Sequence, residues 1–164
     1  MTTHKGIEHK TLENAFTWIP LDKRVSKFGG AMAPRRMETR SPLLWLANKD
    51  GELFLVNAST ESLDNVEVKQ GGFTSVDDAT VNLTSNAKYH YTAVKPNVAV
   101  KIEHYDGFYD LDYILQVSIK VTSKQLGELY IISPAEKGGV KETVLLWDNG
   151  ECGKNVTVEV ITKA

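Results

Sequence analysis

Short runs in which apolar and polar residues alternate recur from Leu43 onward, and this pattern constrains the fold more than any other feature of the chain. Because successive side chains of a strand point to opposite faces of a sheet, such alternation produces strands with one apolar face. Turn signals separate the runs roughly every 8 to 12 residues, and almost no helical period is present. The pattern therefore predicts an all-β protein, an antiparallel β-sandwich of about ten strands.

The longest predicted strand spans residues 112–122, where every second residue from Tyr113 to Val121 is apolar. A hairpin is predicted where Asp50-Gly51 separates the runs 43–48 and 52–57. Asn149-Gly150 is a second turn signal, which leads from 140–147 to 155–162. Further strands are expected at 65–70, 73–76, 80–84, 88–94, 98–104 and 128–133.

The first 42 residues differ from the rest in charge and in regularity. They carry eight basic and four acidic side chains, so their net charge is +4, and with a total of −2 the remainder carries −6. The glycine pair Gly29-Gly30 and three single prolines, Pro20, Pro34 and Pro42, interrupt any regular element there. We expect a basic N-terminal segment, 1–42, that packs on a β-sandwich domain, 43–164, or on a neighbouring chain. A short helix over 12–18, with Thr11 as its N-cap, and an extended arm are equally compatible with this segment.

Two tryptophans mark strands that are apolar on both faces. Trp45 lies in Leu-Leu-Trp-Leu and Trp147 in Leu-Leu-Trp. A strand of this kind must cover its outer face, either with another segment of the chain or with a partner. We expect Trp18, Trp45 and Trp147 to be core or interface anchors.

Composition limits the classes of function. A chain of 164 residues with net charge −2 has no global attraction for nucleic acid or for an anionic membrane. Cys152 is the only cysteine, and no apolar run is long enough for a signal peptide or a membrane span. We therefore expect a cytoplasmic protein with no membrane association, and the sequence predicts no cofactor and no metal site.

One passage resembles a known family. In 53–68 an apolar strand ends in Asn57, a polar turn follows, and the next strand opens with Asn65-Val66-Glu67-Val68. This passage resembles the B-to-C strands of bacterial immunoglobulin-like modules of the fibronectin-III and CARDB kind. The resemblance implies an immunoglobulin-like sandwich, here with extra strands after Pro134 and without the paired cysteines of antibody domains.

The stretch 104–113 concentrates aromatic and acidic residues, and it is the first candidate site. Its rings could stack on a sugar or peptide, its aspartates could bind a hard cation, or it could be an ordinary loop between strands. The candidate ligand-binding residues are Tyr105, Asp106, Phe108, Tyr109, Asp110 and Asp112.

A second candidate site is basic. Arg35, Arg36 and Arg40 could bind an anionic partner, because a guanidinium pairs with phosphate or carboxylate through two hydrogen bonds. The simpler interpretation is that these residues pack on the acidic body or on a second subunit. Nucleic acid is disfavoured because the chain as a whole is slightly acidic.

No catalytic set of residues appears in the sequence. The leading hypothesis is therefore a non-enzymatic protein-interaction module that can also associate with itself. The alternative is a ligand- or carbohydrate-binding β-sandwich that uses the 104–113 loop. The third is an enzyme of unrecognised type, assembled from distant strands.

Overall fold

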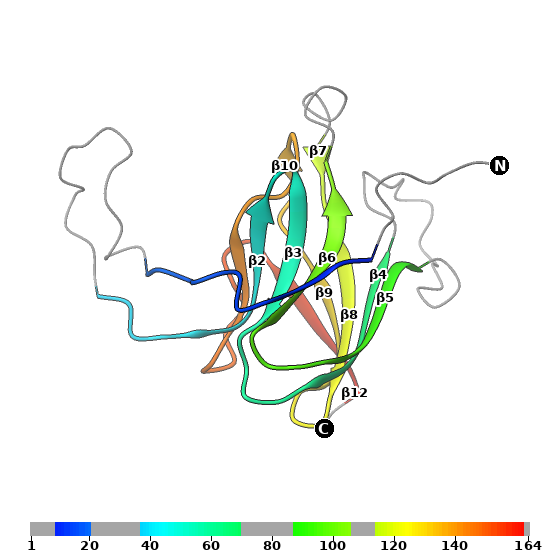
Figure 1. The fold of residues 1–164 in the computed structure, drawn as a ribbon. Coiled ribbons are helices and arrows are strands. Elements are labelled where there is room, and N and C mark those ends of the chain that lie inside the picture. The colour runs from blue at the N-terminus through cyan, green and yellow to red at the C-terminus, as the bar shows by residue number, and fades with distance from the viewer. Residues whose placement is uncertain (1–8, 21–36, 70–86, 106–113, 163–164) are drawn as a thin grey trace.

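The computed structural model describes residues 9–20, 37–69, 87–105 and 114–162 (Figure 1). Within this part of the chain there is no α-helix, and hence no helix that could cross a membrane. The described strands form two five-stranded sheets and one two-stranded sheet, and every pair of neighbouring strands is antiparallel.

Each large sheet combines strands from distant parts of the chain. Sheet A has the order β1 (Thr11–Glu13), β6 (Val98–His104), β3 (Glu52–Asn57), β2 (Pro42–Lys49), β11 (Thr143–Trp147). Sheet B has the order β12 (Thr157–Thr162), β9 (Gly127–Ile132), β8 (Ser118–Ser123), β4 (Leu63–Lys69), β5 (Ala87–Val94). The small sheet pairs β10 (Glu136–Lys137) with β7 (Ile114–Leu115).

The two large sheets pack face to face around one hydrophobic core. Alternate residues of each strand point into it, as the period of two requires. The predicted all-β antiparallel sandwich is confirmed. The fully buried members with the largest side chains include Leu44, Leu46, Leu53, Leu55, Leu63, Tyr89, Ile102, Ile119, Ile131 and Leu145.

The hairpin predicted at Asp50-Gly51 is confirmed. Lys49 pairs with Glu52, which leaves a two-residue loop. Asp50 has φ 52° and Gly51 has φ 79°. Two successive positive φ values match the right-handed twist of the flanking strands, which is why an Asp-Gly pair occurs here. The strands expected at 73–76 and 80–84 lie outside the described residues.

The crossing from sheet A to sheet B depends on one buried asparagine. The amide Nδ2 of Asn57 donates to the backbone oxygens of Glu61, at 2.9 Å, and Val94, at 3.0 Å. Its Oδ1 accepts hydrogen bonds from the Ser59 backbone N, at 3.1 Å, and Oγ, at 2.6 Å. Because a buried amide must satisfy both its donors and its acceptor, this network fixes the path between β3 and β4.

The prediction of a single strand over 112–122 was wrong. The described residues form two short strands, and the chain changes partner between them: β7 pairs with β10, whereas β8 pairs with β9. Two hydrogen bonds with Ser133 fix the interruption between β7 and β8. The Ser133 Oγ accepts from the Val117 backbone N at 2.9 Å, and the Ser133 backbone N donates to Val117 O at 3.0 Å. Gln116 Nε2 donates to Ser133 O at 2.9 Å. The inward alternation itself is present from Val117 to Val121.

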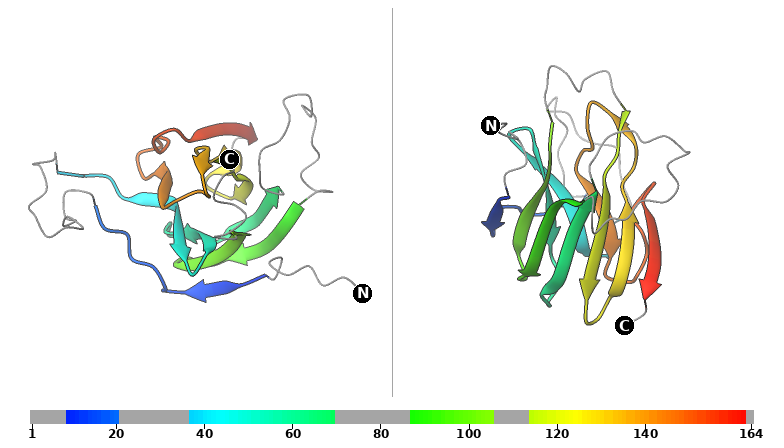
Figure 2. Two further views of the ribbon diagram at one scale, coloured as in Figure 1. Left: turned by 90° about the horizontal axis from the view of Figure 1, so that it is seen from above. Right: turned by 90° about the vertical axis from the view of Figure 1, so that its right-hand side faces the viewer.

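Residues 9–20, here called the strap, are extended rather than helical. β1 pairs with β6 at the edge of sheet A, and the chain then crosses the outer face of this sheet toward β11 (Figures 1 and 2). The backbone N of Asn14 donates to Asn97 O at 2.9 Å, and the backbone N of Lys101 donates to Lys10 O, also at 2.9 Å. The extended arm is therefore the observed alternative. The division of the chain at residue 42 stays a prediction.

The strap covers a second apolar cluster on the outer face of sheet A. Trp45, Ala47, Phe54, Val56 and Ala99 form the buried part of this cluster. Leu12, Phe16 and Trp18 of the strap pack against it, together with Ala58 and Val144. The ring centre of Phe16 lies 5.4 Å from that of Phe54 and 6.3 Å from that of Trp45. In the described residues, the N-terminal segment thus supplies the cover that strands apolar on both faces require.

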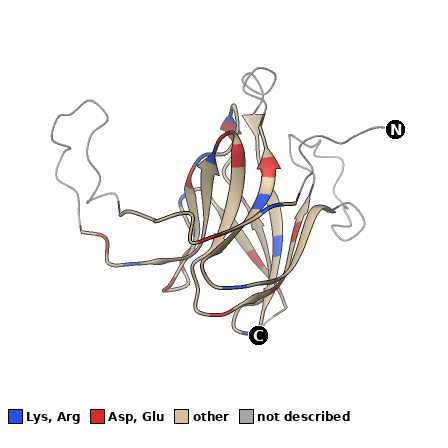
Figure 3. Ribbon diagram, in the orientation of Figure 1, with Lys and Arg blue, Asp and Glu red and all other residues tan. Residues whose placement is uncertain are grey.

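The outer face of sheet B needs no such cover because it is polar. Lys120 Nζ lies 3.2 Å from a carboxylate oxygen of Glu128 and 3.8 Å from one of Glu67. Acidic and basic residues are interspersed along the described strands rather than gathered in one field (Figure 3). A solvated face of this kind distinguishes sheet B from sheet A.

A glycine substitution tests the packing at the β11 edge. A Cβ at Gly153 would lie 1.5 Å from the backbone oxygen of Val144, whereas a Cβ at Gly150 would meet nothing within 4 Å. We expect Gly153→Ala to lower the free energy of unfolding by about 3 kcal/mol, because backbone must move to make room. Gly150→Ala should cost only about 1 kcal/mol, from its φ of +90°.

Urea denaturation of the two variants measures both costs. Equal destabilisation by the two substitutions would contradict the close approach of the chain at Gly153.

Candidate functional site

A cavity opens where the strap reaches the β11 edge of sheet A. Its volume is about 710 Å³, within the range of ligand pockets. Segments from five parts of the chain meet there: the strap, the residues before β2, the residues around β10, β11 itself and the β11–β12 connection. The lining residues are Trp18, Glu38, Arg40, Pro134, Ala135, Glu136, Glu142, Thr143, Val144, Trp147, Cys152, Lys154 and Asn155. We call this cavity the strap pocket.

Three side chains form a layered wall of the strap pocket. Trp18 meets Trp147 edge to face, with ring centres 5.4 Å apart and an interplanar angle of 80°. The guanidinium carbon of Arg40 lies 4.0 Å from the ring centre of Trp147. Both contacts are attractive, because the ring face is negative and both the ring edge and the guanidinium are positive. Trp147 is only 8% exposed, whereas Trp18 is half-buried.

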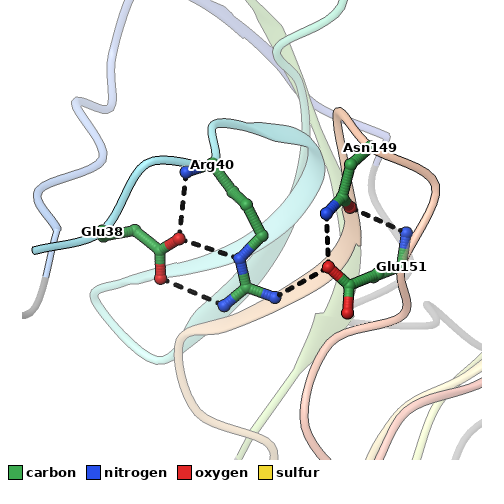
Figure 4. A network of polar contacts seen from close by, with 4 residues as sticks. All are labelled: Glu38, Arg40, Asn149 and Glu151. Atoms are coloured by element: carbon green, nitrogen blue, oxygen red, sulfur yellow. Dashed lines mark hydrogen bonds and ion pairs between the residues drawn. The ribbon is translucent and has the colours of Figure 1, made fainter. Parts of the chain in front are cut away.

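A polar network holds Arg40 in place (Figure 4). Its Nε and Nη2 donate to the two carboxylate oxygens of Glu38, at 2.8 and 3.0 Å, and its backbone N donates to Glu38 at 3.0 Å. Its Nη1 lies 3.7 Å from Glu151. Asn149 in turn donates its side-chain amide to Glu151 and accepts from the Glu151 backbone N at 3.0 Å. The network therefore joins the segment before β2 to the turn after β11.

The same network shifts the pKa values of its members. The side-chain hydrogen bonds from Arg40 lower the pKa of Glu38 to about 2. The hydrogen bond with Glu38 raises the pKa of Arg40. Glu38 is thus ionised, and Arg40 charged, at every pH at which the protein would normally be studied.

Arg40 is the basic candidate that the structure describes, and its guanidinium is engaged by carboxylates of its own chain. An anionic partner would have to compete with Glu38 for it. Arg35 and Arg36 lie outside the described residues. The proposed binding of an anion by these three arginines stays a prediction.

Of the aromatic and acidic loop, only its first residues are described. His104 is exposed, and Tyr105 is half-buried with its ring against the core. A Cβ at Gly139 would lie 2.9 Å from the Tyr105 ring, so the ring packs directly on that glycine. Asp106, Phe108, Tyr109, Asp110 and Asp112 lie outside the described residues, and the ligand-binding role of the loop stays a prediction.

A partly buried cluster of charged residues joins the start of the strap to β3, β5 and β6. Lys101 is 3% exposed, and its Nζ lies 2.9 Å from Glu52, which also pairs with Lys10 at 2.7 Å. Tyr91 donates its hydroxyl to Lys101 O at 2.6 Å and accepts from the Lys10 backbone N at 3.2 Å. Burial raises the pKa of Tyr91 to about 12, so it is a donor here rather than a base. The cluster therefore links β5 of sheet B to β6 of sheet A.

Three of the four outer strands of the large sheets are short or are contacted by another part of the chain. β1 has three residues. At β5, the backbone N of His90 donates to His9 Nε2 at 3.1 Å. At β11, the chain turns back, so that Leu146 bridges Cys152 and the Gly153 backbone N donates to Leu145 O at 3.0 Å. These contacts limit pairing with another chain at those edges.

The fourth outer strand, β12, is different. It pairs with β9 on one side, and no other described strand lies beyond it in sheet B. All of its residues except Val158 are exposed, including Val160 at 58% and Ile161 at 51%. The inward-facing alternation predicted for Val156, Val158 and Val160 thus ends with Val160 largely open to solvent. β12 presents an open strand edge with apolar side chains, which is a template for pairing.

No metal centre is present in the described residues, where no three histidine, cysteine, aspartate or glutamate side chains gather closely enough to hold an ion. Cys152 is exposed and lines the strap pocket. The sequence singled out Trp18, Trp147 and Arg40 separately but gave no sign that they meet. It gave no signal for Glu38 or Glu151, and it singled out Asn149 only as a turn residue.

Comparisons with known proteins add no family assignment. No protein-family model matches the chain, and no curated protein or solved structure matches it either. The function must therefore be argued from the geometry of this chain alone.

Lowering the pH tests the Glu38–Arg40 contact. Because the pKa of Glu38 is lowered, the contact stabilises the fold fully above pH 4.5 and is lost as the pH falls through about 2. Tryptophan fluorescence followed over this range should change as Arg40 leaves Trp147.

Glu38→Gln should remove this acid-dependent change, whereas Glu159→Gln, an exposed carboxylate on sheet B, should leave it intact. The same acid profile for Glu38→Gln and the unchanged chain would show that Glu38 does not hold Arg40.

Proposed function

We propose that the chain is a non-enzymatic interaction module that associates with a second copy of itself through the outer edge of β12. The open edge of β12 is the single observation that carries this proposal. Folded proteins usually protect a sheet edge by shortening it, charging it or covering it. The other three outer strands are short or are contacted by another part of the chain, whereas no described segment covers β12, which carries one charged side chain, Glu159, and a register shift between Val160 and Thr162.

A second copy fits this edge because the edge can pair with itself. Antiparallel pairing about a twofold axis at Val160 places two valines opposite each other and sets Glu159 opposite the partner's Ile161. The two Glu159 carboxylates, the only charges between Thr157 and Thr162, then do not face each other. Two copies of sheet B would become one continuous sheet, and the exposed side chains of Val160 and Ile161 would gain cover on both of its faces.

We also propose that the sandwich is immunoglobulin-like, as the resemblance of 53–68 implies. The strand order supports this: β3 pairs with β6 in one sheet, while β4, β8 and β9 are neighbours in the other. These are the positions of strands B and E, and of C, F and G, in such domains. β1, β11 and β12 would be the additions. Since such sandwiches serve many purposes, this likeness supports only the proposed fold. The proposed role in self-association depends on the β12 edge.

Charging the edge tests the self-association. Val160→Lys should convert the dimer to a monomer, because the two lysines would face each other across the twofold axis and repel. Ile114→Lys is the matched control, since Ile114 is 55% exposed but lies on β7. Size-exclusion chromatography with light scattering over increasing protein concentration measures the mass.

A strict monomer for the unchanged chain at high concentration would contradict the proposal. A dimer that survives Val160→Lys, or that Ile114→Lys dissociates, would place the interface elsewhere.

A further inference from the structure

We infer that the strap pocket binds an uncharged ligand rich in hydroxyl groups, a sugar of one or two rings. This site is distinct from the aromatic loop 104–113, and it does not depend on the β12 edge. Three features of the pocket lead to this ligand class: an accessible tryptophan, a mixture of donors and acceptors, and a nearly balanced charge.

Trp18 supplies the apolar contact. Its ring contacts that of Trp147 at an interplanar angle of 80°, and the guanidinium of Arg40 lies over the Trp147 ring. Trp18 is half-buried and lines the pocket, so part of its ring remains accessible there. A sugar ring has one face of C–H groups that packs on an aromatic ring, and a fixed indole loses little entropy when it is covered. Pro134, Ala135 and Val144 extend this apolar wall.

The pocket also offers both kinds of hydrogen-bonding group. Lys154 and Asn155 can donate, and the carboxylates of Glu136 and Glu142 accept, as can the Thr143 hydroxyl, which itself donates to Lys141 O at 2.7 Å. A hydroxyl group donates one hydrogen bond and accepts others, so a sugar can use donors and acceptors that lie close together. An apolar ligand would exclude water from these polar groups and offer no hydrogen bonds in its place, at a cost for each group that it buries.

Charge balance argues against a strongly ionic ligand. The lining has three carboxylates, from Glu38, Glu136 and Glu142, and two cations, from Arg40 and Lys154. Arg40 is already paired with Glu38 and Glu151, and Glu136 lies 3.6 Å from Lys141. A phosphate would therefore approach three carboxylates, and an ammonium group would approach two cations. A neutral ligand avoids both costs.

Saturation-transfer difference NMR on the full chain tests this inference. The probes are the methyl glycosides of glucose, galactose, mannose and N-acetylglucosamine, with maltose and cellobiose as two-ring ligands. Glucuronate and glucosamine are the charged comparisons. We expect at least one neutral sugar to bind, and to bind more tightly than its charged relatives.

Four variants locate the binding. Trp18→Ala should weaken it about tenfold or more, and Trp18→Phe should restore part of the loss because a ring remains. Asn155→Asp adds a charge without altering the strap and should weaken binding of the neutral sugar. Tyr130→Ala is the aromatic control, since Tyr130 is half-buried on sheet B and away from the pocket.

Absence of transfer to every neutral sugar would overturn the inference, as would preferential binding of glucuronate or glucosamine. Binding that both Trp18→Ala and Asn155→Asp leave unchanged would place the sugar site elsewhere. Because Val160 does not line the pocket, sugar binding by Val160→Lys separates this inference from the proposed self-association.

Discussion

The structure depends on the cover that the strap provides for the outer face of sheet A. β2 and β3 are apolar on both faces, so a two-layer sandwich alone would leave Trp45, Phe54 and Val56 in contact with water. Burying a large apolar side chain contributes about 1.5 to 3 kcal/mol, so an uncovered cluster of this size would forfeit several such contributions. Phe16 and Trp18 bury it within the same chain, and the polar outer face of sheet B needs no equivalent.

The same requirement produces the candidate site. To cover the sheet, the strap must reach β11, and there Trp18 meets Trp147 while Arg40 lies over the ring of Trp147. Glu38, Asn149 and Glu151 then fix Arg40. The strap pocket is thus a consequence of how the outer face is covered. The β12 edge, in contrast, belongs to sheet B, and none of the described residues covers it.

The fold could be predicted where neighbouring residues determine it, and the prediction failed where the structure depends on contacts between residues far apart in the chain. Asp50-Gly51 specifies its own turn, and the alternation of Val117, Ile119 and Val121 specifies an inward face. The break before Val117 was missed because it depends on Ser133, a distant residue whose hydroxyl looks ordinary in the sequence. The strap pocket was missed for the same reason: Trp18, Arg40 and Trp147 are far apart in the chain, and no spacing rule joins them. The sequence indicated that the strands containing Trp45 and Trp147 need a cover on their outer face, but it did not indicate the path that the strap takes across sheet A.

The contact between Phe16 and the outer face of sheet A is the most direct point at which to test this account. A nuclear Overhauser measurement between ring protons, made on the full chain in solution, reports that contact without any substitution. The account predicts cross-peaks from the Phe16 ring to the rings of Phe54 and Trp45, whose centres lie 5.4 and 6.3 Å away. Absence of both cross-peaks, with the assigned Phe16 ring in contact with water instead, would contradict it.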